Sequence, residues 1–149
     1  MKNFIVDREW VENHYHEEMN FTIPEGATKI EGRAFEECYS LKSIEIPDSV
    51  TKIGEEAFRG CKSLVSIEIP DSVTEIEMGA FCHCYSLESI NIPNSVTKMG
   101  AYAFYYCESL KSIEIPDSVT EIGAESFVEC NNLTIRCNKE SYAEEYAKE

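Results

Sequence analysis

The sequence predicts an α/β solenoid built from stacked repeats, with short strands on one side and short helical or 3₁₀ turns on the other. Five segments of 23 residues align without gaps and together cover residues 21–135 of the 149-residue chain. An Ile-Pro pair recurs at the same place in every segment, and so do eight apolar positions, with mild swaps such as Met99 for Ile and Ser126 for Ala. A fixed period of this length is typical of repeat architectures, in which each unit buries its apolar face against its neighbours. The five repeats are 21–43, 44–66, 67–89, 90–112 and 113–135.

The second repeat illustrates the elements expected in each unit. Its first three residues, 44–46, alternate apolar and polar side chains, which predicts a short strand with one buried face. Pro47 lacks an N–H group and should end the strand ladder, and the following Asp48-Ser49 pair suits a turn. The stretch from Gly54 to Phe58 suits about one turn of α- or 3₁₀-helix. Neither half can bury its apolar face alone, so stacking of the units is required.

The pattern IxIPxSVTxIGxxAFxxCxSLxxI resembles the BspA-like leucine-rich repeat, also called the Treponema pallidum type, over roughly three quarters of the chain. This resemblance implies a right-handed leucine-rich-repeat solenoid with a parallel sheet along one side. Repeats one and three depart from the pattern, because Glu31 and Glu77 stand where the others have glycine. Gly32 and Gly79 lie nearby, so we expect the turn to differ locally in these two repeats.

The segments that flank the repeats, 1–20 and 136–149, are expected to cap a single domain, since a solenoid needs polar terminal units to close its core. A helix is expected from Asp7 to Met19, with Val11, Tyr15 and Met19 on one stripe and Trp10 beside it. At the other end, residues 141–144 fit a capping box and predict a C-terminal helix with an apolar stripe. The alternative is a fragment of a longer repeat array.

The composition excludes several classes of function. Lys and Arg number 13 against 28 Asp and Glu, which gives a net charge of −15. Such a chain lacks the basic surface that nucleic-acid binding needs, and anionic lipid headgroups repel it. No apolar run reaches the ~20 residues of a membrane span. No signal peptide is visible, which predicts a cytoplasmic protein; a surface or secreted location is the alternative that the family resemblance implies.

The sequence predicts neither a metal site, nor a cofactor, nor a catalytic centre. Five cysteines recur at the repeat period and are therefore expected to be reduced core residues: Cys38, Cys61, Cys84, Cys107 and Cys130. The Cys82-His83-Cys84 run and the His14/His16 pair are the candidates for a small metal-dependent hydrolase. However, Cys84 should point into the core, and the two histidines suit a solvated cap.

One candidate binding surface is the outward face of the predicted sheet. Its central row carries Thr22, Glu45, Glu68, Asn91 and Glu114. In register, Glu45 lies next to Glu68, and a like-charged pair of this kind costs about 0.2–1 kcal/mol. A basic partner or a cation would relieve this repulsion. The alternative is a solvated face that merely records repeat duplication.

The second candidate surface is in repeat four, which sums to +1 between two repeats at −5. It carries Tyr102, Tyr105 and Tyr106 where repeat two has Glu56, Arg59 and Gly60. Tyrosine is enriched at interface hot spots, although these rings could simply pack over the edge of the solenoid. Tyr39 and Tyr85 share another register and are expected to belong to the scaffold.

These patterns together predict a monomeric, non-catalytic protein–protein interaction module, either adhesion-like or a scaffold. The family resemblance implies the same, since it points to adhesion and binding proteins with host or matrix proteins as partners. The partner of this chain is expected to be a protein, and a basic one if the acidic face is used. The alternative is a purely structural or self-associating unit.

Overall fold

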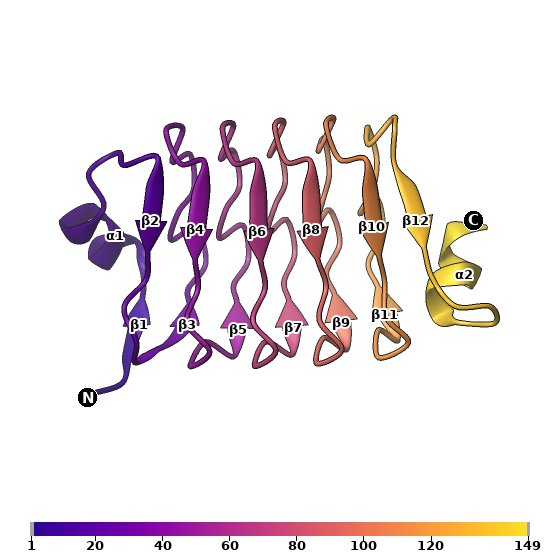
Figure 1. Ribbon diagram of the computed structural model, residues 1–149, viewed down its shortest axis with the longest axis horizontal. Coiled ribbons are helices and arrows are strands. Elements are labelled where there is room, and N and C mark those ends of the chain that lie inside the picture. Colours follow the sequence, from indigo (N-terminus) through magenta and orange to yellow (C-terminus); the bar gives the residue numbers. More distant parts are fainter. Residues whose placement is uncertain (1, 149) are drawn as a thin grey trace.

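The computed structural model describes residues 2–148. These residues form a solenoid in which successive turns stack side by side (Figure 1). Each turn contributes one strand to a column that we call sheet one and one strand to a column that we call sheet two. The strands of sheet one are β2 (Asn20–Thr22), β4 (Ser43–Glu45), β6 (Ser66–Glu68), β8 (Ser89–Asn91), β10 (Ser112–Glu114) and β12 (Thr134–Arg136). The strands of sheet two are β1 (Phe4–Val6), β3 (Ala27–Ile30), β5 (Lys52–Ile53), β7 (Glu75–Ile76), β9 (Lys98–Met99) and β11 (Glu121–Ile122). All pairs are parallel, which confirms the predicted solenoid with a parallel sheet.

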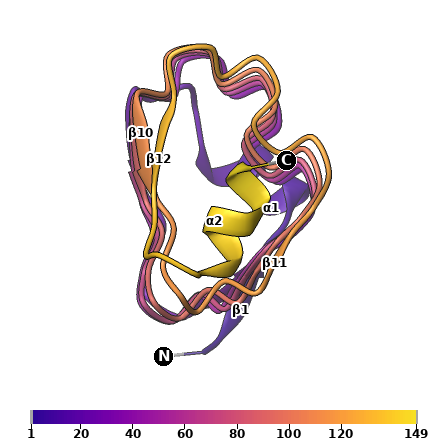
Figure 2. The same ribbon diagram turned by 90° about the vertical axis from the view of Figure 1, so that its right-hand side faces the viewer.

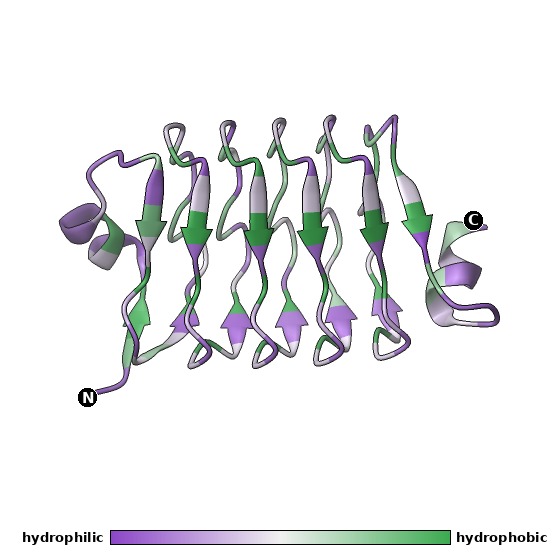
Figure 3. Ribbon diagram, viewed as in Figure 1, coloured by the Kyte–Doolittle hydropathy of each residue, from purple (hydrophilic) through white to green (hydrophobic). Residues whose placement is uncertain are grey.

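Sheet one follows the predicted alternation. In β6, Ile67 is buried between the exposed residues Ser66 and Glu68, and the same apolar centre recurs along the column (Figure 3). The strands therefore begin one residue before the isoleucine that opens each repeat. This position lets one side chain enter the core while its two neighbours face solvent.

Sheet two was not predicted. Most of its strands contain two residues, which is too short for any periodic pattern. From β5 to β11 its outward side chains alternate in charge, because Lys52 pairs in register with Glu75, Glu75 with Lys98, and Lys98 with Glu121, whereas Lys29 of β3 lies in register with Lys52. Lys98 Nζ lies 3.9 Å from Glu75 and 3.7 Å from Glu121, so neighbouring turns are linked by ion pairs.

The expected helical turn is instead a run of hydrogen-bonded turns. In repeat two, the Ala57 N–H donates to the carbonyl of Gly54 at 3.2 Å, whereas the Phe58 N–H donates to Ala80 of the next repeat at 2.9 Å. Because every second N–H bonds to the neighbouring repeat, a continuous helix cannot form. Each turn also holds two residues at positive φ, here Glu56 and Gly60. We call the surface of these turns, residues 31–39, 54–62, 77–85, 100–108 and 123–131, the turn edge.

The core is a set of ladders that run along the solenoid. Phe35, Phe58, Phe81, Phe104 and Phe127 stack with ring centroids 5.3–5.6 Å apart. The five periodic cysteines are buried and free, as predicted. Four of their thiols donate to phenylalanine carbonyls of the preceding repeat, as Cys61 does to Phe35 at 3.1 Å. Burial raises the pKa of these thiols, to about 11 for Cys38 and Cys130.

At Gly54 the lack of a side chain permits close packing against the preceding turn. A Cβ atom on Gly54 would lie 2.7 Å from the backbone nitrogen of Gly32 in the preceding turn. Glu77 occupies the same register in repeat three, yet the turn there keeps the common pattern: the Ala80 N–H donates to the Glu77 carbonyl at 3.3 Å, and Gly79 and His83 hold the two positive-φ positions, so the expected local difference of this turn is not seen. The Glu77 carboxylate accepts the Glu55 N–H at 2.8 Å and pairs with Lys52 Nζ at 2.6 Å.

The N-terminal helix α1 (Arg8–His14) is shorter than predicted. Asp7 caps its start, and Val11 and Tyr15 are buried as expected. The helix ends at His14 because Tyr15 adopts an extended conformation; the Tyr15 N–H still donates the last helical bond, to the carbonyl of Val11. Met19 therefore lies outside the helix and is 54% exposed, so the prediction that Met19 lies on the helix's apolar stripe was wrong.

The C-terminal helix α2 (Tyr142–Ala147) begins as the capping-box pattern predicts. The Ser141 hydroxyl accepts the Glu144 N–H at 3.1 Å, and Ala143 is buried. Tyr146 meets the last ring of the phenylalanine ladder edge-on at 6.1 Å. Viewed along the solenoid, the turns superpose and α2 lies across the C-terminal end (Figure 2).

Candidate binding surfaces

The three tyrosines of repeat four lie together on the turn edge. The Tyr105 ring meets Tyr102 at 5.6 Å and Tyr106 at 4.7 Å, in both cases edge-to-face. Tyr102 and Tyr106 occupy the two positive-φ positions of their turn, both with φ 59°. Tyr102 is 38% exposed, and the other two are half-buried. The cluster therefore presents ring surface to solvent while its members also pack on one another.

His83 and Tyr85 of repeat three extend this cluster, which sequence reasoning did not foresee. The His83 ring stacks on Tyr106 at 5.2 Å with an interplanar angle of 8°. It also meets Tyr105 and Tyr85 edge-on, each at 5.7 Å. His83 and Tyr106 are 23 residues apart and so share one register. That spacing is the signal that could have placed them side by side.

The surroundings of His83 favour its neutral form. Burial lowers the pKa of His83, and the charges of Arg59 and Lys62 lower it further. The Cys82 thiol lies 2.9 Å from His83 Nδ1 and is itself buried, and burial raises its pKa. A neutral imidazole stacked on a phenol extends the aromatic surface without adding charge. We call His83, Tyr85, Tyr102, Tyr105 and Tyr106 the aromatic cluster.

The central row of sheet one lies in the predicted register, and all five of its predicted residues are exposed. The strand ladder is interrupted between β4 and β6, so sheet one consists of a two-stranded and a four-stranded part. A groove of about 450 Å³ lies at the interruption, lined by residues 43–46 and 66–68. Glu45 and Glu68 lie on its two sides, whereas Thr22 donates a hydrogen bond to Glu45 at 3.2 Å. The interruption therefore coincides with the like-charged pair in the row.

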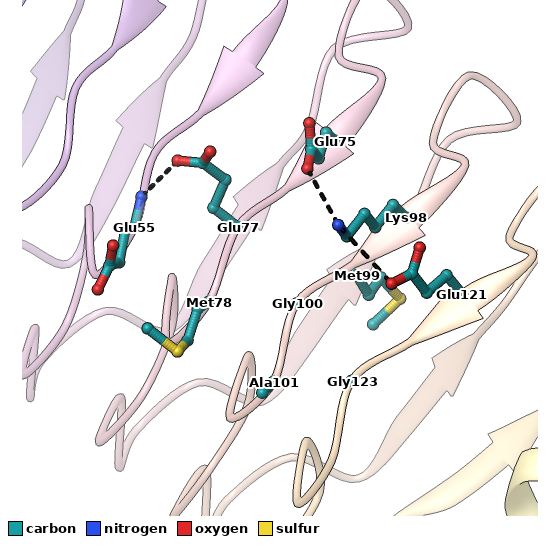
Figure 4. Close-up of a pocket in the computed structure, with 10 residues that line it drawn as sticks. All are labelled: Glu55, Glu75, Glu77, Met78, Lys98, Met99, Gly100, Ala101, Glu121 and Gly123. Atoms are coloured by element: carbon teal, nitrogen blue, oxygen red, sulfur yellow. Dashed lines mark hydrogen bonds and ion pairs between the residues drawn. The ribbon is translucent and has the colours of Figure 1, made fainter.

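A second hollow, of about 360 Å³, lies on sheet two beside the turns of repeats three to five (Figure 4). Met78 is 42% exposed at one side, and Gly100 and Gly123 lie among the residues that line it. Its lining carries four glutamates and one lysine, and Lys98 lies between two of them, Glu75 and Glu121. The lining is therefore acidic, and Lys98 neutralises only part of its charge.

The candidate metal ligands are not brought together. Cys84 is fully buried and its thiol donates to the carbonyl of Phe58 at 3.2 Å, so it points away from Cys82 into the core as predicted. His14 Nδ1 lies 2.8 Å from the carbonyl of Trp10, and the two rings stack at 4.3 Å. Within residues 2–148, no three His, Cys, Asp or Glu side chains form a group that could hold a metal ion. Within the same range, no helix is long and apolar enough to cross a membrane.

The chain is similar to known repeat proteins. Residues 14–134 match the model of the BspA type leucine rich repeat region in six copies, one more than the gapless alignment contains. A solved leucine-rich repeat protein of T. pallidum is 34% identical over 88% of this chain and 62% of its own, with a TM-score of 0.82. A leucine-rich cell surface protein from Faecalibacterium prausnitzii is 40% identical over 87% of this chain and 34% of its own, with a TM-score of 0.81. A leucine-rich repeat protein from Bacteroides ovatus is 36% identical over 80% of this chain and 33% of its own, with a TM-score of 0.77. No protein with a curated description matches.

Proposed function

Because the chain belongs to the BspA-type leucine-rich repeat family, we propose that it is a non-catalytic module that binds a protein through its aromatic cluster. The observation that carries the proposal is five partly exposed rings gathered on one edge of the rigid scaffold. Rigid aromatic side chains supply contact area at little entropic cost and dominate interface hot spots. A repeat solenoid holds such a surface without rearrangement on binding.

Sheet one is the second candidate surface, with Glu45, Glu68, Asn91 and Glu114 as its contact residues. The groove at the interrupted ladder favours it, because two carboxylates face solvent there without an intervening cation. A basic partner at this surface would be attracted over long range, and the attraction would weaken with salt.

The F. prausnitzii relative is named a cell surface protein. Its name supports a surface location for this chain over the cytoplasmic location expected from the sequence. An extracellular protein partner would then be the natural target of the module. Fractionation of the producing cells, followed by immunodetection of the chain, distinguishes the two locations.

The test replaces the three tyrosines by the residues that repeat two carries in the same register, as Tyr102→Glu, Tyr105→Arg and Tyr106→Gly. These residues already fit the turn, since Glu56 and Gly60 hold the same positive-φ positions. Wild type and variant are used to capture partners from native extracts at low and high salt, and binding is then repeated with the purified partner. A partner held by wild type and lost by the variant, with unchanged circular dichroism, is the expected result.

Two other outcomes would redirect the proposal. A partner that both proteins hold, but that high salt removes, would move the binding surface to sheet one; a Glu45→Gln/Glu68→Gln variant checks that assignment. Absence of any partner, together with concentration-dependent sedimentation, would instead indicate a self-associating structural unit.

A further inference from the structure

The two halves of the turn edge differ in how their carboxylates are paired. In repeats one and two, Arg33 Nε lies 2.8 Å from Glu56, and Arg59 lies 3.4 Å from Glu56 and 3.7 Å from Glu36. Glu36 and Glu56 there hold guanidinium groups supplied by the chain itself. Within residues 2–148, Glu37 and Glu55 of this half take part in no ion pair, so its negative charge is neutralised only in part.

Repeat five, next to the tyrosines of repeat four, carries two carboxylates at corresponding places without such partners. Glu125 shares the register of Arg33 and Glu56, and Glu129 shares that of Glu37. The turn edge of repeats three to five contains no lysine or arginine. Within residues 2–148, neither Glu125 nor Glu129 takes part in an ion pair, and Glu129 accepts one hydrogen bond, from Asn131 at 3.3 Å.

These carboxylates lie beside the tyrosines. The Tyr102 N–H donates to the carbonyl of residue 124 at 3.0 Å, and the Tyr106 N–H to that of Val128 at 2.9 Å. Glu125 and Glu129 hold positive φ values of 57° and 63°, as the two tyrosines do, so the backbone directs all four side chains alike. Between them lies Val128, which is 39% exposed. The charges of both glutamates contribute, after burial and Tyr106, to a raised pKa of Tyr105.

We propose that this half of the turn edge binds an arginine side chain of the partner protein, with its guanidinium against the tyrosine rings and its charge paired to Glu125 and Glu129. The inference rests on the proposed function and names the chemistry of the partner. A guanidinium stacks on aromatic faces and forms bidentate bonds to carboxylates, whereas a lysine ammonium is a compact, strongly hydrated charge. The site would therefore reproduce, with an external arginine, the pairing that Arg33 and Arg59 provide in repeats one and two. A net charge of −15 also favours a basic partner.

The experiment measures binding of fluorescein-labelled hexa-arginine and hexa-lysine peptides to the full chain by fluorescence anisotropy at physiological salt. A Glu125→Gln/Glu129→Gln variant removes two charges at the proposed site. A Glu9→Gln/Glu17→Gln variant removes two exposed charges from the N-terminal cap, outside both candidate surfaces, and serves as the matched control. We expect wild type to prefer hexa-arginine at least threefold, and the site variant to weaken its binding about tenfold, which corresponds to ~1.4 kcal/mol. The control variant should change binding less than about twofold, as expected for distant exposed charges.

Equal losses in the two variants would overturn the proposal, because they would show a response to net charge alone. Equal affinity for the two peptides, or unchanged binding by the site variant, would overturn it as well. These failures are separable from failure of the proposed function. A protein partner that the tyrosine variant fails to bind but that Glu125→Gln/Glu129→Gln still binds would support the aromatic cluster as the binding surface. The same result would refute the proposed recognition of an arginine side chain.

Discussion

Replacing Glu68 by asparagine is expected to stabilise the solenoid, because Glu45 and Glu68 are like-charged neighbours at the point where sheet one is interrupted. Neighbouring strands lie ~4.8 Å apart, so carboxylates at about 6 Å in water repel by roughly 0.7 kcal/mol. Asparagine is the residue of repeat four at this position, where Asn91 lies between Glu68 and Glu114 in register. Completion of the ladder between β4 and β6 would add to this gain. We expect a total of about 0.5–1.5 kcal/mol, or ~1–6 °C in Tm for a chain of this size.

Urea unfolding followed by circular dichroism measures the free energy of unfolding of wild type and Glu68→Asn. The gain should shrink at 1 M salt, where the screening length is about 3 Å. Glu114→Asn is the matched control, since Glu114 lies in register between Asn91 and Arg136 and has no like-charged neighbour to lose. An unchanged or lower stability of Glu68→Asn at low salt would refute the reasoning. So would an equal gain from Glu114→Asn.

The remaining predictions concern the core, the turn and two titratable groups. Phe81→Ala should lower the free energy of unfolding by about 3–5 kcal/mol in urea titration, because it opens a cavity in the middle of the ring ladder; a loss below 1 kcal/mol would mean that the ladder is not tightly packed. Gly54→Ala should lower Tm by several degrees, since its Cβ would meet the preceding backbone; an unchanged Tm would show that the turns can separate. The pKa of His83 is lowered in the fold, so its contribution to stability is present above its unfolded pKa and is lost as pH falls through about 6.5 and below. The Tm of His83→Asn should therefore fall less than that of wild type between pH 8 and pH 5.5. An identical fall in Tm for the two proteins would contradict this. With a thiol-specific disulfide reagent, partly exposed Cys137 should react first and the buried ladder cysteines only on unfolding; rapid reaction of several thiols in the native state would argue against the packed ladder.

Much of the fold could be predicted because its determinants are local and repeated. The alternation of residues 44–46 predicts the strand, and the stack then follows from the need to bury each apolar face. The periodic cysteines could be assigned to the core for the same reason. The capping box at Ser141 could also be predicted from the sequence, since it depends on contacts within four residues.

The candidate surfaces were only partly predictable. The tyrosines of repeat four stood out because they break the repeat, but their contact with His83 depends on register between two turns. The predicted extent of α1 was wrong because the helix ends before Tyr15. The side chain of Tyr15 is buried in the core beside Phe21 and Phe35. A pattern of apolar residues cannot show where such a contact ends a helix.

By itself the sequence determined the period, the strand that opens each repeat, the core ladders and the outward row of sheet one. Each of these depends on residue type and spacing alone. The tertiary structure decided where the backbone hydrogen bonds go: into the next repeat along the turn edge, into the unpredicted sheet two, and not across the interruption between β4 and β6. It also decided which side chains of different turns meet, as His83 meets Tyr106. These outcomes depend on groups 23 residues apart, whose approach is set by the stacking of whole turns.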